Sequence, residues 1–178
     1  MSHEREDRSE LSKLIDRIAR KLTGTKREVR VEKAEVAVKE ISPDISHGIY
    51  VFDVNKKVWV RLEDDNKSLE PKEDGVYVVY FNNTKCPACR VFDIIWNIFV
   101  SNAKDTSIKY YSVVCKWFTH ECESKGAKES FKKYNVKSSP TILIWKVRSG
   151  SIVFTEKIEG VTTPTKLAEA INRVQQLS

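Results

Sequence analysis

The side chains best suited to chemistry are two cysteines spaced three positions apart, in the tetrapeptide Cys86-Pro87-Ala88-Cys89. A pair at this spacing can form and break a disulfide, or supply half of the ligands of a zinc site. Pro87 has a φ angle that suits the first turn of a helix, and it has no N–H to leave unpaired there. We therefore expect Cys86 at the N-terminus of a helix, where backbone N–H groups and the helix dipole stabilise a thiolate.

This placement predicts different roles for the two sulfurs. Cys86 should be the more exposed and the more acidic one, and Lys85 adds a positive charge beside it. Since the thiolate is the nucleophile in disulfide exchange, we assign the attack to Cys86. Cys89 lies one turn inside the expected helix and is assigned the resolution of the mixed disulfide. The catalytic pair is thus predicted to be Cys86 and Cys89, with Lys85 and Pro87 tuning the thiolate.

The other two cysteines, Cys115 and Cys122, enclose a segment of six residues. A disulfide between them is our first hypothesis, although so short a loop gains little stability from closure. A second redox pair that relays electrons to the first, or two free thiols, are the alternatives. A zinc site built on Cys86 and Cys89 would take two more ligands from Cys115, His120 and Cys122. We expect neither a metal nor a cofactor, because zinc sites usually hold Cys-x-x-Cys in a tight turn rather than at the start of a long apolar helix.

Two aromatic residues, Trp117 and Phe118, lie within the same segment. They could form an apolar patch that faces a substrate, or they could pack into the core. We expect at least one of them to pack into the core.

The segments around the dithiol read as alternating strands and helices. Residues 76–81 form a continuous apolar run, which is typical of a strand buried on both faces. Residues 91–100 are apolar nearly all round, as in a buried helix. Further on we expect a strand at 108–115, a helix at 125–134, a hairpin of strands at 141–147 and 152–157, and a helix at 164–177 with Thr163 as its N-cap. From Gly75 the predicted order is β-α-β-α-β-β-α.

The N-terminal third begins with an expected amphipathic helix at residues 9–22, and its two faces differ in character. The apolar stripe comprises Leu11, Leu14, Ile15, Ile18 and Leu22, and the opposite face carries Lys13, Arg17, Arg20 and Lys21. A strand within residues 28–41 and a hairpin of strands at 49–54 and 58–62 should follow. Residues 63–74 read as a loop or a short helix.

Composition limits the class of protein. Hydrophobic residues make up 40% of the 178 residues and charged residues 31%, which indicates a folded globular chain. No apolar run approaches the roughly 18 residues of a membrane span, and the charged first residues lead to no apolar signal segment, so we expect a cytoplasmic protein. The net charge of +6 favours anionic partners, which the basic N-terminal helix could bind. Packing of that helix on the protein's own core is the interpretation we favour.

Taken together, these features resemble the thioredoxin superfamily over about residues 58–178. The matching residues are the strand 76–81, Cys86-Pro87-Ala88-Cys89, Tyr134-Asn135-Val136, Ser139-Pro140-Thr141 followed by Ile142-Leu143-Ile144, and Gly160 before the last helix. The resemblance implies an α/β fold with a central mixed sheet flanked by helices. It also implies a cis Pro140 against the dithiol, and a Ser139 backbone that pairs with an extended substrate segment. Residues 1–57, with the helix, the strand and the first strand of the hairpin, would be an N-terminal extension to a domain at 58–178.

Three positions differ from the pattern of thioredoxins. Lys85 stands where the family usually has Trp, and Pro87 takes the second motif position, as in glutaredoxins. The buried acid that assists the resolving thiol in thioredoxins would fall near Tyr80, and a tyrosine cannot serve as a base at neutral pH. No clear set of glutathione-binding residues is visible.

The function that the resemblance implies is thiol–disulfide exchange on protein disulfides or thiols, with a separate electron donor or acceptor. One alternative is a binding module that docks on a larger protein or nucleic-acid assembly and carries a non-catalytic or regulatory dithiol. The other is a zinc-binding Cys-x-x-Cys site.

Overall fold

The structure, a computed structural model, describes residues 37–62 and 66–177. The amphipathic helix expected at residues 9–22 lies outside the described residues. Of the strand expected within residues 28–41, the described part contains the short strand β1 (Ala37–Val38). Residues 66–74 form neither a helix nor a strand.

The described residues form one mixed sheet of seven strands, in the order β1-β3-β2-β5-β4-β6-β7. β4 and β5 are parallel, and the other neighbouring pairs are antiparallel. The strands beyond β1 are β2 (Gly48–Asp53), β3 (Val58–Arg61), β4 (Gly75–Asn83), β5 (Ile108–Cys115), β6 (Thr141–Arg148) and β7 (Ser151–Glu159). Both hairpins predicted from the sequence are confirmed as β2–β3 and β6–β7.

β4 lies near the middle of the sheet, and this position accounts for its apolar sequence. Every residue of β4 after Gly75 is buried, because β5 and β6 flank it and helices cover both faces. The strand continues past the predicted end at Phe81 through Asn82 and Asn83. These two polar residues bring the chain to the start of the next helix.

Three strand ends meet at one edge of the sheet. Asn83 at the end of β4 is paired with Cys115 at the end of the parallel strand β5. Phe81 is paired with Thr141, the first residue of the antiparallel strand β6. The segments that follow β4 and β5 and the segment that precedes β6 therefore emerge side by side, which is where ligands bind in open α/β sheets.

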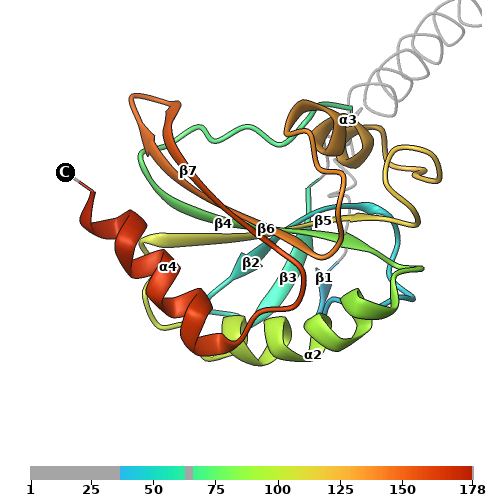
Figure 1. Cartoon of the computed structure of the whole chain (residues 1–178), viewed down its shortest axis with the longest axis horizontal. Coiled ribbons are helices and arrows are strands. Elements are labelled where there is room, and N and C mark those ends of the chain that lie inside the picture. The colour runs from blue at the N-terminus through green and yellow to red at the C-terminus, as the bar shows by residue number, and fades with distance from the viewer. Residues whose placement is uncertain (1–36, 63–65, 178) are drawn as a thin grey trace, which may run out of the picture. The chain divides into compact units, whose positions relative to one another are not determined.

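The three helices within the described residues lie on opposite sides of the sheet (Figure 1). α2 (Pro87–Ser101) and α4 (Pro164–Gln176) cover one face, and α3 (Lys125–Lys133) covers the other. Thr163 is the N-cap of α4, as predicted, and its hydroxyl accepts a hydrogen bond from the N–H of Lys166. Ser124 caps α3 in the same way through the N–H of Ala127.

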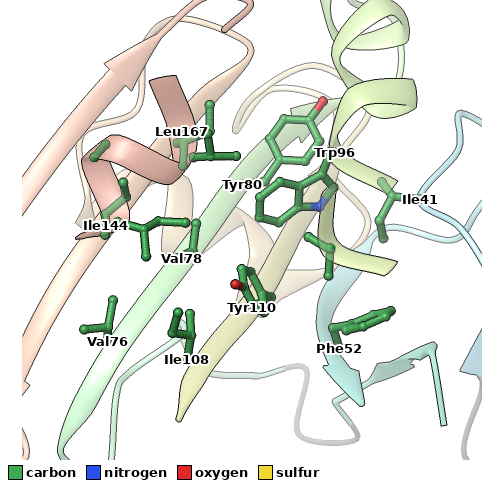
Figure 2. Packing of buried hydrophobic residues seen from close by; sticks show 14 of the residues in the cluster. Ile41, Phe52, Val76, Val78, Tyr80, Trp96, Ile108, Tyr110, Ile144 and Leu167 are labelled. Carbon is green, nitrogen blue, oxygen red and sulfur yellow. The ribbon is translucent and has the colours of Figure 1, made fainter. Parts of the chain in front are cut away.

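Each face of the sheet has its own apolar cluster. Beneath α2 and α4, the Trp96 ring packs beside Tyr80 of β4, with 5.5 Å between ring centroids (Figure 2). The cluster beneath α3 centres on Phe81 and Phe131, whose centroids are 5.1 Å apart. Neighbouring residues of β4 thus serve opposite faces, as the alternation of side chains along a strand requires.

The N-terminal hairpin belongs to the same sheet as the later strands. β2 pairs with β5, so that residues on both sides of position 58 contribute to one sheet. The domain boundary expected between residues 57 and 58 stays a prediction. Within residues 37–62 and 66–177, no helix has the length and apolar character required to cross a bilayer.

Candidate active site

The turn from β4 into α2 places Cys86 at the start of a helix. Cys86 is the N-cap of α2, and Pro87 is its first residue. The N–H of Cys86 donates to the carbonyl of Asn83 (3.0 Å), and the N–H of Cys89 donates to Cys86 Sγ (3.3 Å). The Cys86 sulfur therefore lies where the unpaired N–H groups of a helix stabilise negative charge.

Cys86 and Cys89 are both free thiols, and both are buried, Cys86 slightly less than Cys89. Cys86 is 6% exposed, whereas Cys89 is 0% exposed. Burial raises the pKa of the Cys89 thiol to about 11, although hydrogen bonds from Ser139 and from the Asn83 backbone act in the opposite direction. At neutral pH Cys89 is protonated, so its thiol needs a proton acceptor before it can attack.

Ser139 contacts both sulfurs from the segment before β6. Cys86 Sγ donates to the Ser139 carbonyl (3.4 Å), and Cys89 Sγ shares a hydrogen bond of 2.8 Å with Ser139 Oγ. The Ser139–Pro140 peptide bond is cis, and the Pro140 carbonyl accepts from the N–H of Gly160 (2.8 Å). The structure thus brings the predicted residues Cys86, Cys89, Ser139 and Pro140 together.

A buried carboxylate lies one helical turn beyond Cys89. Asp93 of α2 is only 5% exposed and accepts hydrogen bonds at Oδ1 from Tyr80 Oη (2.8 Å) and Asn82 Nδ2 (2.9 Å). Its Oδ2 pairs with Arg90 Nη2 at 3.0 Å. Burial raises the pKa of Asp93 to about 6, and the three partners limit the rise. Asp93 therefore carries negative charge at neutral pH and is easily protonated.

The Tyr80 hydroxyl donates to this carboxylate and interacts electrostatically with Cys89. Burial holds the pKa of Tyr80 well above its usual value, and the nearby Asp93 and Cys89 groups raise it further. Tyr80 itself stays neutral, in agreement with the sequence-based argument that it cannot be the base. A buried acid lies instead on the helix, at Asp93, and sequence reasoning missed it. Its signal was present, because Asp93 is the one charged residue within the apolar stretch 91–100.

Lys85, predicted to tune the thiolate, makes a different contact. Its Nζ donates to both carboxylate oxygens of Glu121, at 3.0 and 2.9 Å. Lys116 Nζ pairs with the same carboxylate at 3.0 Å. These two ammonium groups hold the pKa of Glu121 below its usual range. Much of the Lys85 charge is therefore offset by a nearby carboxylate, whereas Pro87 occupies its predicted place in the first turn.

Cys115 and Cys122 are bonded to each other, with an S–S distance of 2.02 Å and a Cα–Cα distance of 4.8 Å. The disulfide removes both sulfurs as ligands for the zinc site considered from the sequence. In the part of the chain that the structure describes, no three side chains of His, Cys, Asp or Glu gather in a way that could hold a metal ion.

Of the comparisons with known proteins, only the one with solved structures bears on the fold. No family model and no curated protein matches the sequence. The solved structure of thioredoxin from Aeropyrum pernix is similar with a TM-score of 0.52 and 15% identity, covering 74% of this chain and 98% of that one. Thioredoxin from Fasciola hepatica is similar with a TM-score of 0.42 and 22% identity, covering 57% and 82%. The first similarity, with the mixed sheet and its three described helices, shows a thioredoxin-like fold of the α/β class.

Proposed function

We propose that this chain, which has a thioredoxin-like fold with a free dithiol, is a thiol–disulfide oxidoreductase that acts on protein disulfides. The observation that carries the proposal is the placement of Cys86 as N-cap of α2, with the Cys89 N–H on its sulfur and Ser139 beside both thiols. A helix N-terminus stabilises the thiolate that exchange requires.

In the first step, the Cys86 thiolate attacks one sulfur of the substrate disulfide. A Cys86–substrate mixed disulfide forms, the substrate disulfide breaks, and one substrate thiolate leaves. The chain segment at Ser139 and Pro140 lies beside the reacting sulfur, since Cys86 Sγ donates to the Ser139 carbonyl. We assign this segment the main-chain binding of an extended substrate.

In the second step, Cys89 attacks Cys86 Sγ, so that the mixed disulfide breaks and a Cys86–Cys89 disulfide forms. The second substrate thiolate leaves, and a separate dithiol donor must reduce the protein for another turnover. Cys89 has to lose its proton first. The proton passes to the Tyr80 oxygen while the Tyr80 proton passes to Asp93, which the 2.8 Å hydrogen bond between Tyr80 and Asp93 supports. Tyrosine thus transfers the proton without becoming a tyrosinate.

Ser139 has a part in this second step that the sequence did not suggest. Its hydroxyl lies 2.8 Å from Cys89 Sγ and lowers the pKa of that thiol. As the Cys89 thiolate develops, the Ser139 hydroxyl donates to it. The side chain of Ser139 therefore assists resolution, in addition to the role proposed for its backbone.

The reduction of insulin disulfides by dithiothreitol tests the proposal. The wild-type chain should accelerate reduction, and Cys86→Ser should abolish the acceleration because it removes the nucleophile. Cys89→Ser should instead accumulate a mixed disulfide with the substrate, detectable by mass spectrometry, since attack proceeds and resolution does not. Circular dichroism of each variant checks that it is folded. A folded wild-type chain that does not accelerate the reduction of insulin disulfides by dithiothreitol would overturn the proposal and favour a binding module.

A further inference from the structure

The segment between the disulfide-bonded cysteines, residues 116–121, which we term the disulfide loop, is attached to the residues just before Cys86. The N–H of Thr84 donates to the Cys115 carbonyl (2.9 Å), and the N–H of Lys85 donates to the Lys116 carbonyl (3.2 Å). These bonds continue the parallel pairing of β4 with β5 beyond the ends of both strands. The disulfide loop therefore begins directly beside the reactive thiol.

The disulfide loop is also closed upon itself. The N–H of Trp117 donates to the Glu121 carbonyl (3.0 Å), and the N–H of Glu121 donates to the Trp117 carbonyl (3.2 Å). The Cys115–Cys122 disulfide closes the same loop from its two ends. A loop constrained in this way loses little conformational entropy when it binds a partner.

The two aromatic residues of the disulfide loop have different surroundings. The N–H of Phe118 donates to Asn83 Oδ1 (2.7 Å), and the Phe118 ring packs edge-on against Phe131 of α3, with 5.9 Å between centroids. The expectation that at least one of the pair packs into the core is confirmed for Phe118. Trp117 rests against the Phe118 ring at 5.1 Å and remains 40% exposed. A large apolar side chain is thus held on a fixed base and open to solvent.

The charges around Trp117 largely satisfy one another. Lys85 and Lys116 both pair with the carboxylate of Glu121. Such a surface offers a flat aromatic contact and only a small excess of positive charge. An exposed tryptophan on a rigid segment is typical of residues that dominate binding to a partner.

We propose that Trp117 is a specificity-determining residue, which binds an apolar side chain close to the disulfide of an extended protein substrate. The inference rests on the proposed exchange function and adds a preference to it. Substrates whose reactive cysteine has apolar neighbours react faster than substrates whose cysteine has small polar neighbours. Contact with one apolar side chain accounts for a preference of about tenfold, which corresponds to about 1.4 kcal/mol.

Two peptide disulfides that differ only in the residues next to the cysteine, Leu in one and Ser in the other, serve as probes. The rate constant for a single turnover of the pre-reduced chain is measured with each peptide. Wild type should favour the Leu peptide by about tenfold, and Trp117→Ala should reduce this preference to less than about twofold by slowing the reaction with the Leu peptide much more than that with the Ser peptide. Trp117→Phe, which keeps an aromatic ring, should retain most of the preference.

Phe154→Ala is the matched control, because Phe154 is an aromatic residue of β7 with a similar exposure of 41%. It should leave the preference unchanged. Competition of the two peptides for a mixed disulfide with the Cys89→Ser variant gives a second readout that does not depend on turnover. A wild type that reacts with neither peptide contradicts the exchange function itself. Equal rates with both peptides, or a preference that survives in Trp117→Ala, contradict the role of Trp117 alone.

Discussion

At the scale of single residues, the two thiols of the site depend on different neighbours. Cys86 uses the backbone at the start of α2, whereas Cys89 is surrounded by the side chains of Ser139 and Tyr80. Chemistry at Cys86 should therefore tolerate changes in the buried polar residues. The reaction of Cys89 should be sensitive to such changes, because its buried thiol has to lose a proton before it can attack.

Asp93→Asn tests the proton acceptor. Reaction with the disulfide reagent dithiobis(nitrobenzoate) releases thionitrobenzoate in two phases. The first phase is the attack of Cys86 on the reagent, and the second is the resolution of the resulting adduct by Cys89. Asp93→Asn should slow the second phase by roughly tenfold or more and leave the first within about twofold, because a base in the transition state is lost. In wild type the second phase should slow as the pH falls through about 6, where Asp93 becomes protonated.

Tyr80→Phe is the companion variant, since it keeps the ring and removes the hydroxyl that we propose passes the Cys89 proton to Asp93. Tyr80→Phe should slow the second phase, the resolution by Cys89, as much as Asp93→Asn does. A second phase of wild-type rate in Asp93→Asn, or an unchanged pH dependence, would exclude Asp93 as the acceptor.

Asp93 should also make stability depend on pH. Its pKa is raised from 3.8 to about 6 in the folded chain, so the folded state favours the protonated acid. The stabilising contribution is fully present below about pH 3.8 and is lost as the pH rises through about 6. Linkage gives on the order of 3 kcal/mol over this interval. The free energy of unfolding of Asp93→Asn, measured in urea, should therefore rise relative to wild type by up to that amount between pH 3.5 and 7. A constant difference across this range would contradict the raised pKa.

At the scale of elements, the site is made where β4 ends, β5 ends and β6 begins. The end of β4 leads into α2 with the dithiol, the end of β5 into the disulfide loop, and the start of β6 carries the Ser139–Pro140 segment. Sheet pairing holds these three segments in register with one another. The helices in turn are positioned by their caps and by the apolar residues beneath them.

The Thr163 cap allows a test at this scale. Its hydroxyl accepts a hydrogen bond from the N–H of Lys166 in the first turn of α4. Thr163→Ala leaves that N–H without its partner and should lower the free energy of unfolding by about 1 kcal/mol. Thr163→Ser keeps the hydroxyl and is the control, with a change of a few tenths of a kcal/mol expected. Chemical denaturation of both variants measures the difference, and equal losses would show that the cap contributes nothing.

At the scale of the whole molecule, the net charge of +6 favours binding to an anionic partner. The basic face expected at residues 9–22 is a candidate for binding an anionic partner, which is a prediction from sequence alone. Replacing its four basic residues by Ala lowers the net charge from +6 to +2, since each substitution removes one positive charge. This variant should elute from a heparin column at a lower salt concentration than wild type, because fewer counterions are released on binding. The four residues replaced in this variant are Lys13, Arg17, Arg20 and Lys21.

A variant with the same net charge is the control for this experiment. Four exposed lysines from the described residues are replaced by Ala instead: Lys39, Lys104, Lys128 and Lys137. If the basic N-terminal face binds the anionic partner, this control elutes later than the N-terminal variant. Identical elution of the two variants would mean that total charge alone governs binding.

The sequence by itself determined the features that depend on neighbours along the chain. The position of the dithiol at a helix N-terminus follows from Pro87, and the cap of α4 follows from Thr163 and the proline after it. The two hairpins and the strand at 76–81 follow from apolar patterns a few residues long. Each of these signals acts over one or two turns of backbone, so local propensity is sufficient to read it.

Only the tertiary structure decided the features that join distant segments. The sequence left three alternatives for Cys115 and Cys122. The fold brings the two residues to a Cα–Cα distance of 4.8 Å with a bond between their sulfurs, which excludes two free thiols. The pairing of Tyr80 with Asp93 requires α2 to pack on β4, because 13 residues separate the two. The side chain of Asn82 donates to Asp93, and that of Asn83 accepts from the N–H of Phe118, so both buried amides find partners on distant segments. Buried polar groups must find partners wherever the fold places them, and those partners are set by packing rather than by local pattern.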